Sequence, residues 1–240
     1  MGPEPLDWLQ EDAAADFAPA YEVVAQRLKR AIHLGQLAPG SKLPAERTFS
    51  AQLGISRVTL REAIRILEGE GYIEVGRGSR GGSVVHSGAM RPAEVRSWMR
   101  KRWDDLEAIL DFRLAVERSA AERAASRVTR KQIAELRELV EEGRASEDVN
   151  AFRTADVRFH MKIAELARSP LLHRAVEEAR AELYVPFRAI SLEDMLETSV
   201  PQHTAIVEAL ERNDAAAAGE AMAAHVRTTG DDLRRLAGRS

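Results

Sequence analysis

The sequence contains no cysteine, and this absence excludes both a disulfide framework and a metal site built on thiolates. No stretch approaches the roughly 18 consecutive apolar residues that a membrane-spanning helix requires. The first residues also lack the basic and apolar regions of a secretory signal peptide. We therefore expect a soluble cytoplasmic protein without a membrane partner.

Charge is unevenly distributed along the 240 residues, although the net charge is only −3. Residues 1–18 contain five acidic and no basic side chains, which predicts a disordered acidic arm. Residues 19–86 have ten basic and six acidic side chains, residues 87–103 have five and one, and the remainder has twenty and twenty-six. The basic segments are therefore the candidates for attracting phosphate. With 45% apolar residues, the chain is long enough for two domains with real cores.

Residues 45–67 show the pattern of two helices around a tight turn. Phe49 and Leu53 are four apart in the first helix, and Gly54 ends it because glycine tolerates the left-handed conformation that a chain reversal needs. Ser56 is a candidate N-cap for the second helix. Spacings of three and four predict one buried face on this helix, formed by Leu60, Ala63, Ile64 and Leu67.

A short β-hairpin is predicted directly after these helices. Gly71 ends the second helix, residues 72–75 alternate like a strand, and residues 83–85 form the returning strand. A flexible turn connects the two strands and contains Gly76, Gly78, Gly81 and Gly82. Residues 19–86 are therefore interpreted as a winged helix-turn-helix, in a chain that is mainly α-helical.

The second helix carries polar side chains in the turns that contact base edges when such a helix enters the major groove of DNA. We expect sequence readout from Arg57, Thr59 and Arg61. Other arginines are better placed to bind phosphate or to reach the minor groove, namely Arg47, Arg77 and Arg80. The alternative is a merely solvated helix face, but the combination with the glycine turn and the wing favours DNA binding.

The segments LPAER and LGISRVTLREAIRILEGEGYIEVGRGSRGG resemble the DNA-binding domain of GntR-family bacterial transcription regulators, over about Pro19 to His86. The resemblance implies a double-stranded DNA operator, contacted by wing glycines such as Gly78 and by Arg47, Arg57, Thr59 and Arg61. Ala45 departs from the family pattern, because serine is common at this helix start. Losing such a cap costs about 1 kcal/mol, and it concerns stability more than recognition.

After an expected linker at 87–103, the chain is almost wholly helical in pattern. Helices are predicted at 104–126, 130–145, 149–168, 171–190, 192–212 with a break before Pro201, and 214–237. The short turns between them predict an all-α antiparallel bundle over residues 104–237.

Polar residues interrupt the apolar faces of three of these helices. Asp156 lies on an apolar stripe, and His160 follows four residues later, so both side chains can converge on one point. His203 and His225 lie on the apolar faces of the last two helices. One carboxylate and three imidazoles suit a divalent transition metal, with zinc as the first choice and nickel or manganese as alternatives.

Each of these residues also has a simpler explanation. A lone inward histidine is more often a hydrogen-bonded core residue, and Asp156 could pair with Arg113 or Arg153. A metal-dependent hydrolase is a further alternative. However, the chain contains no HExxH, GxSxG or CxxC and no obvious carboxylate reserved as a general base. We therefore expect no catalytic residues.

Residues from about Leu106 to Leu233 resemble the FCD effector domain that accompanies this DNA-binding module in FadR-like regulators. The matching segments are DFRLAVERSAAERAA, DVRFHMKIAELARSP, PQHTAIVEALERND and AMAAHV. The resemblance implies a small carboxylate effector beside a metal, held in part by Arg113. In metal-binding members an aspartate and three histidines hold the ion, which implies Asp156, His160, His203 and His225.

Together these features predict a homodimeric, ligand-responsive transcription regulator that acts as a repressor, with activation as the alternative. A metal with three neutral imidazole ligands keeps positive charge and can bind an organic acid. Because the two DNA-binding modules must match half-sites about one helical turn apart, a small shift of the bundles could lower operator affinity. Two alternatives keep DNA binding: a purely structural metal, and a metal-free bundle that serves only for dimerisation.

Overall fold

A computed structural model describes residues 19–76, 82–86 and 92–239 of the chain. The expected acidic arm at 1–18 lies outside the described residues. The chain divides into two compact units: an N-terminal unit, Met1–Lys29 with Ser41–His86, and a helical unit, Arg30–Gly40 with Ser87–Ser240. No helix in the described ranges combines the length and the apolar character needed to cross a membrane.

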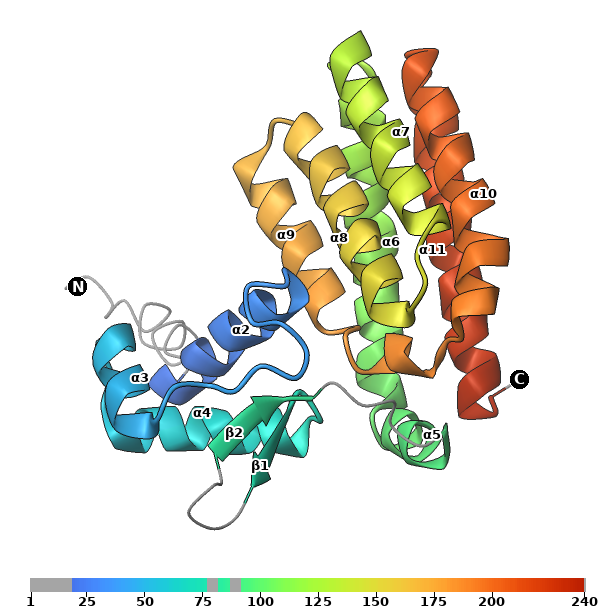
Figure 1. The fold of residues 1–240 in the computed structure, drawn as a ribbon. Helices are drawn as coiled ribbons and strands as arrows, with labels where there is room; N and C mark the ends of the chain where they lie inside the picture. The colour runs from blue at the N-terminus through green and yellow to red at the C-terminus, as the bar shows by residue number, and fades with distance from the viewer. Residues whose placement is uncertain (1–18, 77–81, 87–91, 240) are drawn as a thin grey trace, which may run out of the picture. The chain divides into compact units, whose positions relative to one another are not determined.

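The described part of the N-terminal unit contains helices and a two-stranded sheet (Figure 1). The two strands pair antiparallel, with Ile73 opposite Val85 and Gly76 opposite Gly82. The elements are α2 (Ala20–His33, in this unit up to Lys29), α3 (Glu46–Leu53), α4 (Arg57–Gly69), β1 (Ile73–Gly76) and β2 (Gly82–Val85).

Local sequence signals account for the turn between α3 and α4. Gly54 ends α3 in the left-handed conformation with φ of 68°, a backbone geometry that residues with a Cβ rarely adopt. Ser56 caps α4, because its Oγ accepts a hydrogen bond from the amide of Thr59 at 3.0 Å. The face of α4 that the spacing predicted is buried, with Leu60, Ala63, Ile64 and Leu67 each at most 7% exposed. The winged helix-turn-helix is therefore confirmed.

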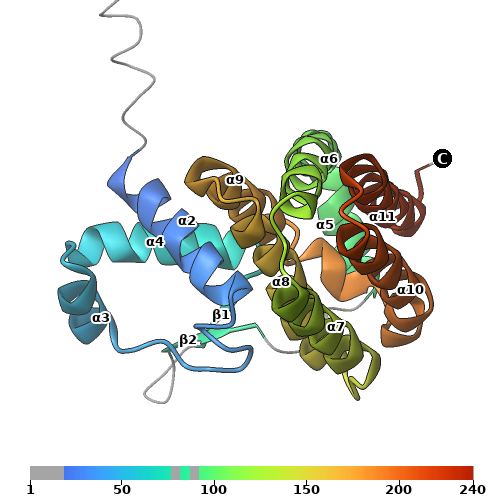
Figure 2. The same cartoon turned by 90° about the horizontal axis from the view of Figure 1, so that it is seen from above.

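The described part of the helical unit forms a bundle, as predicted. Seen from above in Figure 2, α6 lies beside α9 and α11, α7 lies beside α8, and α10 packs against α7 and α11. One continuous apolar core joins these helices. The elements are α5 (Pro92–Lys101), α6 (Trp103–Ala125), α7 (Arg130–Arg144), α8 (Val149–Leu166), α9 (Pro170–Ala181), the 3₁₀ helix η1 (Pro186–Ala189), α10 (Leu192–Glu211) and α11 (Ala215–Ala237).

The expected linker at 87–103 differs from the structure, because most of it is the helix α5. Val95 and Met99 of α5 are fully buried in the core of the helical unit. Arg96, Arg100 and Lys101 masked the signal, since these exposed basic side chains hide the apolar face of an amphipathic helix. This part of the chain therefore belongs to the bundle and is not merely a connection.

Two of the predicted helices, each of which contains a proline, differ from the structure. The helix predicted at 171–190 ends at Ala181, and the residues from Leu183 to Pro186 are all buried, which one face of a continued helix could not achieve. In contrast, α10 runs through Pro201 without the predicted break. A proline inside a helix costs about 3 kcal/mol, and buried residues on both sides of Pro201, such as Val200 and Ile206, offset this cost.

Candidate metal centre and DNA-reading helix

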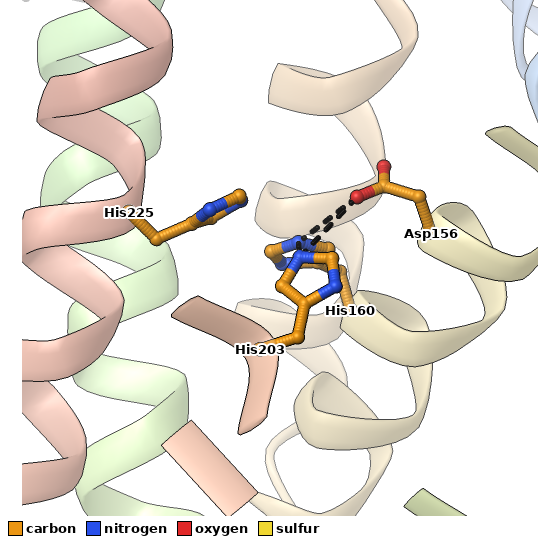
Figure 3. A group of neighbouring side chains, drawn as sticks. All are labelled: Asp156, His160, His203 and His225. Carbon is orange, nitrogen blue, oxygen red and sulfur yellow. Dashed lines mark hydrogen bonds and ion pairs between the residues drawn. The ribbon is translucent and has the colours of Figure 1, made fainter. Parts of the chain in front are cut away.

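Four polar side chains from three helices meet inside the helical unit. Asp156 and His160 lie one turn apart on α8, His203 lies on α10, and His225 lies on α11. Figure 3 shows all four side chains directed toward a common point. One potential ligand atom from each residue lies within 4.8 Å of the others, and the three histidines are buried. The structure thus brings together the predicted set of metal-ligating residues.

The contacts within this cluster are close. His160 Nε2 is 3.3 Å from His203 Nε2, and Asp156 Oδ1 is 3.5 Å and 3.4 Å from these two nitrogens (Figure 3). The ring of His225 stacks on the ring of His160, with 5.0 Å between the centroids. A group of carboxylate and imidazole donors at such distances leaves room for one shared cation between them.

The outer nitrogens of two histidines have partners of their own. His160 Nδ1 lies 2.5 Å from Glu117 Oε2, and His225 Nδ1 lies 2.9 Å from the side-chain oxygen of Gln202. An acceptor beside Nδ1 favours the ring form that has its proton on Nδ1, and in this form the lone pair of Nε2 is directed into the cluster. Neighbouring residues of this kind orient metal-ligating histidines in proteins.

The other two members of the cluster are also held in place. The ring of His203 stacks on Phe159 with 4.3 Å between the centroids. Asp156 accepts a hydrogen bond from Arg180 on Oδ2, which leaves Oδ1 toward the histidines. The sequence had suggested Arg113 or Arg153 as the partner of Asp156, whereas the structure pairs it with Arg180.

A network of buried charges surrounds the cluster. Glu117 accepts hydrogen bonds from Arg113 Nε at 2.5 Å and from Arg180 Nη1 at 3.2 Å, and all three side chains are at most 1% exposed. Together with Asp156, these residues supply two positive and two negative charges. The network is thus neutral as it stands, and the histidines do not need to carry charge to balance it.

The protonation states suit metal binding. Burial lowers the pKa of His203 to about 3, and burial together with the neighbouring His203 holds the pKa of His225 well below its ordinary value. Burial would raise the pKa of Asp156, but the charge of Arg180 and the contact with His160 hold it well below the usual range. Neutral imidazoles and an ionised carboxylate are the forms that bind metals.

Arg113 lies beside this cluster. The resemblance to FCD domains implied that this residue helps to hold the effector. Its side chain is buried, its guanidinium carbon lies 5.5 Å from the centre of the Phe187 ring, and its Nη1 has no hydrogen-bond partner within the described ranges. Arg113, Asp156 and His225 line one cavity, together with Thr198, Thr229 and residues of α8, α10 and η1. Arg113 thus lines a small cavity next to the histidines, and its buried Nη1 has no hydrogen-bond partner among the described residues.

The expected DNA-reading residues lie on α4 and α3. Arg57 and Arg61 are exposed, with 60% and 48% of their side-chain surface accessible, and Thr59 is half-buried in the first turns of α4. Arg47 is exposed on α3. The wing residues Arg77, Gly78 and Arg80 lie outside the described residues.

Sequence reasoning did not identify Glu117, Arg180 or Gln202. Glu117 follows Arg113 by four residues on the buried side of α6, so a charged pair on an apolar stripe was an available signal. Arg180 had no such signal, because its partner Glu117 is 63 residues away in the chain. Gln202 directly precedes the predicted ligand His203, but this neighbouring position in the chain does not indicate a role in the site.

A winged helix-turn-helix joined to a helical bundle with an internal polar site defines a class of protein, the transcription regulators with a separate effector domain. The family model described as "Bacterial regulatory proteins, gntR family" matches residues 20–84, and the FCD domain model matches residues 108–228. The chain belongs to the gntR family and carries an FCD domain, which confirms both resemblances. Its relatives are regulators of transcription and not enzymes.

Named relatives cover most of the chain. The "Putative L-lactate dehydrogenase operon regulatory protein" of Escherichia coli is 32% identical, over 89% of this chain and 86% of the relative. The "Exu regulon transcriptional regulator" of the same species is 32% identical, over 87% of this chain and 82% of the relative. The solved structure of E. coli McbR/YncC has a TM-score of 0.55 at 20% identity, covering 91% and 99% of the two chains, and shows the shared fold alone.

Proposed function

We propose that this gntR-family regulator is a homodimeric repressor whose operator affinity is controlled by a small organic acid, bound beside a divalent metal in the FCD domain. The observation that carries the proposal is the convergence of Asp156, His160, His203 and His225 on one point, with potential ligand atoms within 4.8 Å of one another. As a DNA-binding regulator, it acts in the cytoplasm of a bacterium.

The donor set fits a transition metal. Three nitrogens and one carboxylate oxygen favour zinc, with nickel or manganese as alternatives. Glu117 and Gln202 orient two of the imidazoles, and Arg180 orients the carboxylate of Asp156. A bound divalent cation supplies positive charge and coordination positions that an anion can share.

Arg113 gives the effector its second point of attachment. A carboxylate that enters the cavity satisfies the unpartnered Nη1 of Arg113, and burying that donor without a partner otherwise costs roughly 1–3 kcal/mol. Arginine binds carboxylates with two parallel hydrogen bonds, so it selects an acid over a neutral molecule. We therefore place the carboxylate of the effector between the metal and Arg113.

Two threonines of the cavity favour an acid that also carries hydroxyl groups. Thr198 and Thr229 donate their hydroxyl protons to the main-chain oxygens of Asp194 and His225, so they can offer only acceptor capacity to a ligand. A ligand hydroxyl supplies the matching donor. L-lactate, which the name of one relative's operon contains, is a small acid of this chemistry.

The N-terminal unit binds the operator. We assign sequence readout to Arg57, Thr59 and Arg61, phosphate binding to Arg47, and further contacts to the wing. Two copies bind two half-sites, and effector binding changes the relative placement of the copies, which releases the operator.

The metal is tested by measuring the metal content of full-length protein purified without chelator. We expect one divalent ion per chain in the wild type and less than a tenth of that content in His203→Ala. If the wild-type protein binds no divalent metal, even when titrated with zinc, nickel or manganese, the metal site is refuted. The alternative of a metal-free bundle that serves only for dimerisation would then hold.

The effector is tested by gel shift with a panel of small carboxylates, with and without hydroxyl groups, on metal-loaded protein. We expect a hydroxylated acid to weaken operator binding only while metal is present. If no acid changes operator affinity and chelation unfolds the bundle, the metal is purely structural.

A further inference from the structure

Glu46, at the first turn of α3, contacts the arginines of the DNA-reading helix. Its Oε2 lies 2.7 Å from Arg61 Nη2, and its Oε1 accepts a hydrogen bond from Arg61 Nε at 3.4 Å. The same Oε2 is 3.7 Å from Arg57 Nη2. Fifteen residues separate Glu46 from Arg61 in the chain, so the helix-turn-helix fold itself creates this contact.

The geometry of the pair leaves part of Arg61 free. A guanidinium group has two edges that can make paired hydrogen bonds, one formed by Nε and Nη2 and the other by Nη1 and Nη2. Glu46 occupies the first edge. The second edge has the donor arrangement that matches O6 and N7 of guanine in the major groove.

Stability of the fold is a poor explanation for this pair. The side chains of Arg61 and Glu46 are 48% and 38% exposed, and exposed ion pairs contribute little to folding. The carboxylate of Glu46 is ionised at neutral pH, and the hydrogen bond from Arg61 lowers its pKa further. A fixed negative charge on a surface that binds a polyanion weakens attraction to phosphate, so it needs a compensating role.

We propose that Glu46 is a positioning residue, which holds the guanidinium of Arg61 in the plane required to read a guanine and keeps it from binding phosphate. This inference rests on the proposed assignment of Arg61 to base readout. Glu46 raises specificity in two ways, because it orders the base-reading arginine and because its charge weakens binding to DNA of any sequence.

The test uses full-length protein and a duplex selected from randomised DNA. Arg61→Ala first identifies the base pair that Arg61 reads. At that position we expect Glu46→Gln to reduce the preference for guanine roughly tenfold, while affinity for random duplex stays equal or increases. The double variant should lose no more preference than Arg61→Ala alone, because the effect of Glu46 passes through Arg61.

Glu62→Gln is the matched control. Glu62 lies on α4, as Arg61 does, and 40% of its side chain is exposed. It forms a similar ion pair with Arg65 Nη1 at 2.7 Å. This variant removes the same charge and should change affinity for all duplexes alike, without loss of base preference. Circular dichroism should show the same helix content for all variants.

Three results would overturn the inference. Glu46→Gln could keep the full preference for guanine, or it could change preference no more than Glu62→Gln does. It could also strengthen binding to the selected and random duplexes equally, which would mean that Glu46 only withholds Arg61 from DNA. If selection yields no preferred duplex at all, the proposed readout by α4 fails as well, so the two failures are distinguishable.

Discussion

Replacing Glu117 by glutamine should disturb the candidate metal centre without removing any predicted ligand. Glu117 contacts His160 Nδ1 at 2.5 Å, Arg113 Nε at 2.5 Å and Arg180 Nη1 at 3.2 Å. Glutamine has nearly the same size and can still accept a hydrogen bond. The change therefore isolates the negative charge of this side chain.

The structure predicts a large effect on the metal-free protein. Both arginines are at most 1% exposed, and without Glu117 only Asp156 remains to balance them. Removing one partner of a buried ion pair costs about 3–5 kcal/mol, and we expect the lower end because glutamine keeps one acceptor. Metal affinity should also fall, roughly 10- to 100-fold, because His160 loses the carboxylate that orients its ring.

Urea unfolding of the full chain, followed by circular dichroism after chelation, measures the first effect, and competition with a chromophoric chelator measures the second. Glu122→Gln is the control, since Glu122 pairs with Arg118 on the same helix at the same spacing but is 38% exposed. The control should unfold at nearly the wild-type urea concentration and bind metal normally. Equal unfolding midpoints and equal metal affinities for the two variants would refute the reasoning about the buried network.

Further predictions concern the effector, the metal and the helix cap. Arg113→Lys should keep the metal but lose at least tenfold in response to a carboxylate, because lysine lacks the paired donors, and a gel shift on metal-loaded protein checks this. Chelation of the wild type should abolish the effector response while circular dichroism retains most of the helix signal, and a collapse of that signal would indicate a structural metal. Ala45→Ser should stabilise α3 by up to about 1 kcal/mol, since Ala45 makes no side-chain cap hydrogen bond, and an unchanged melting temperature would contradict this.

Short-range signals in the sequence were sufficient for the helix-turn-helix. Gly54 and Ser56 specify the turn through their own backbone preferences, and the spacing of Leu60 and Leu67 identifies the buried face of α4. Asp156 and His160 were visible for the same reason, because a polar residue on an apolar stripe conflicts with its local surroundings. Such features depend on residues within a few positions of one another.

Tertiary packing decided the features that depend on distant residues. Pro201 lies within a continuous helix whereas the chain near Pro186 is not α-helical, and only the burial of the neighbouring side chains distinguishes them. The roles of Arg180 and Glu46 likewise arise from contacts between helices. Periodicity in a sequence reports which face of a helix is buried, but it contains no information on which other helix covers that face, and therefore none on which charges meet there.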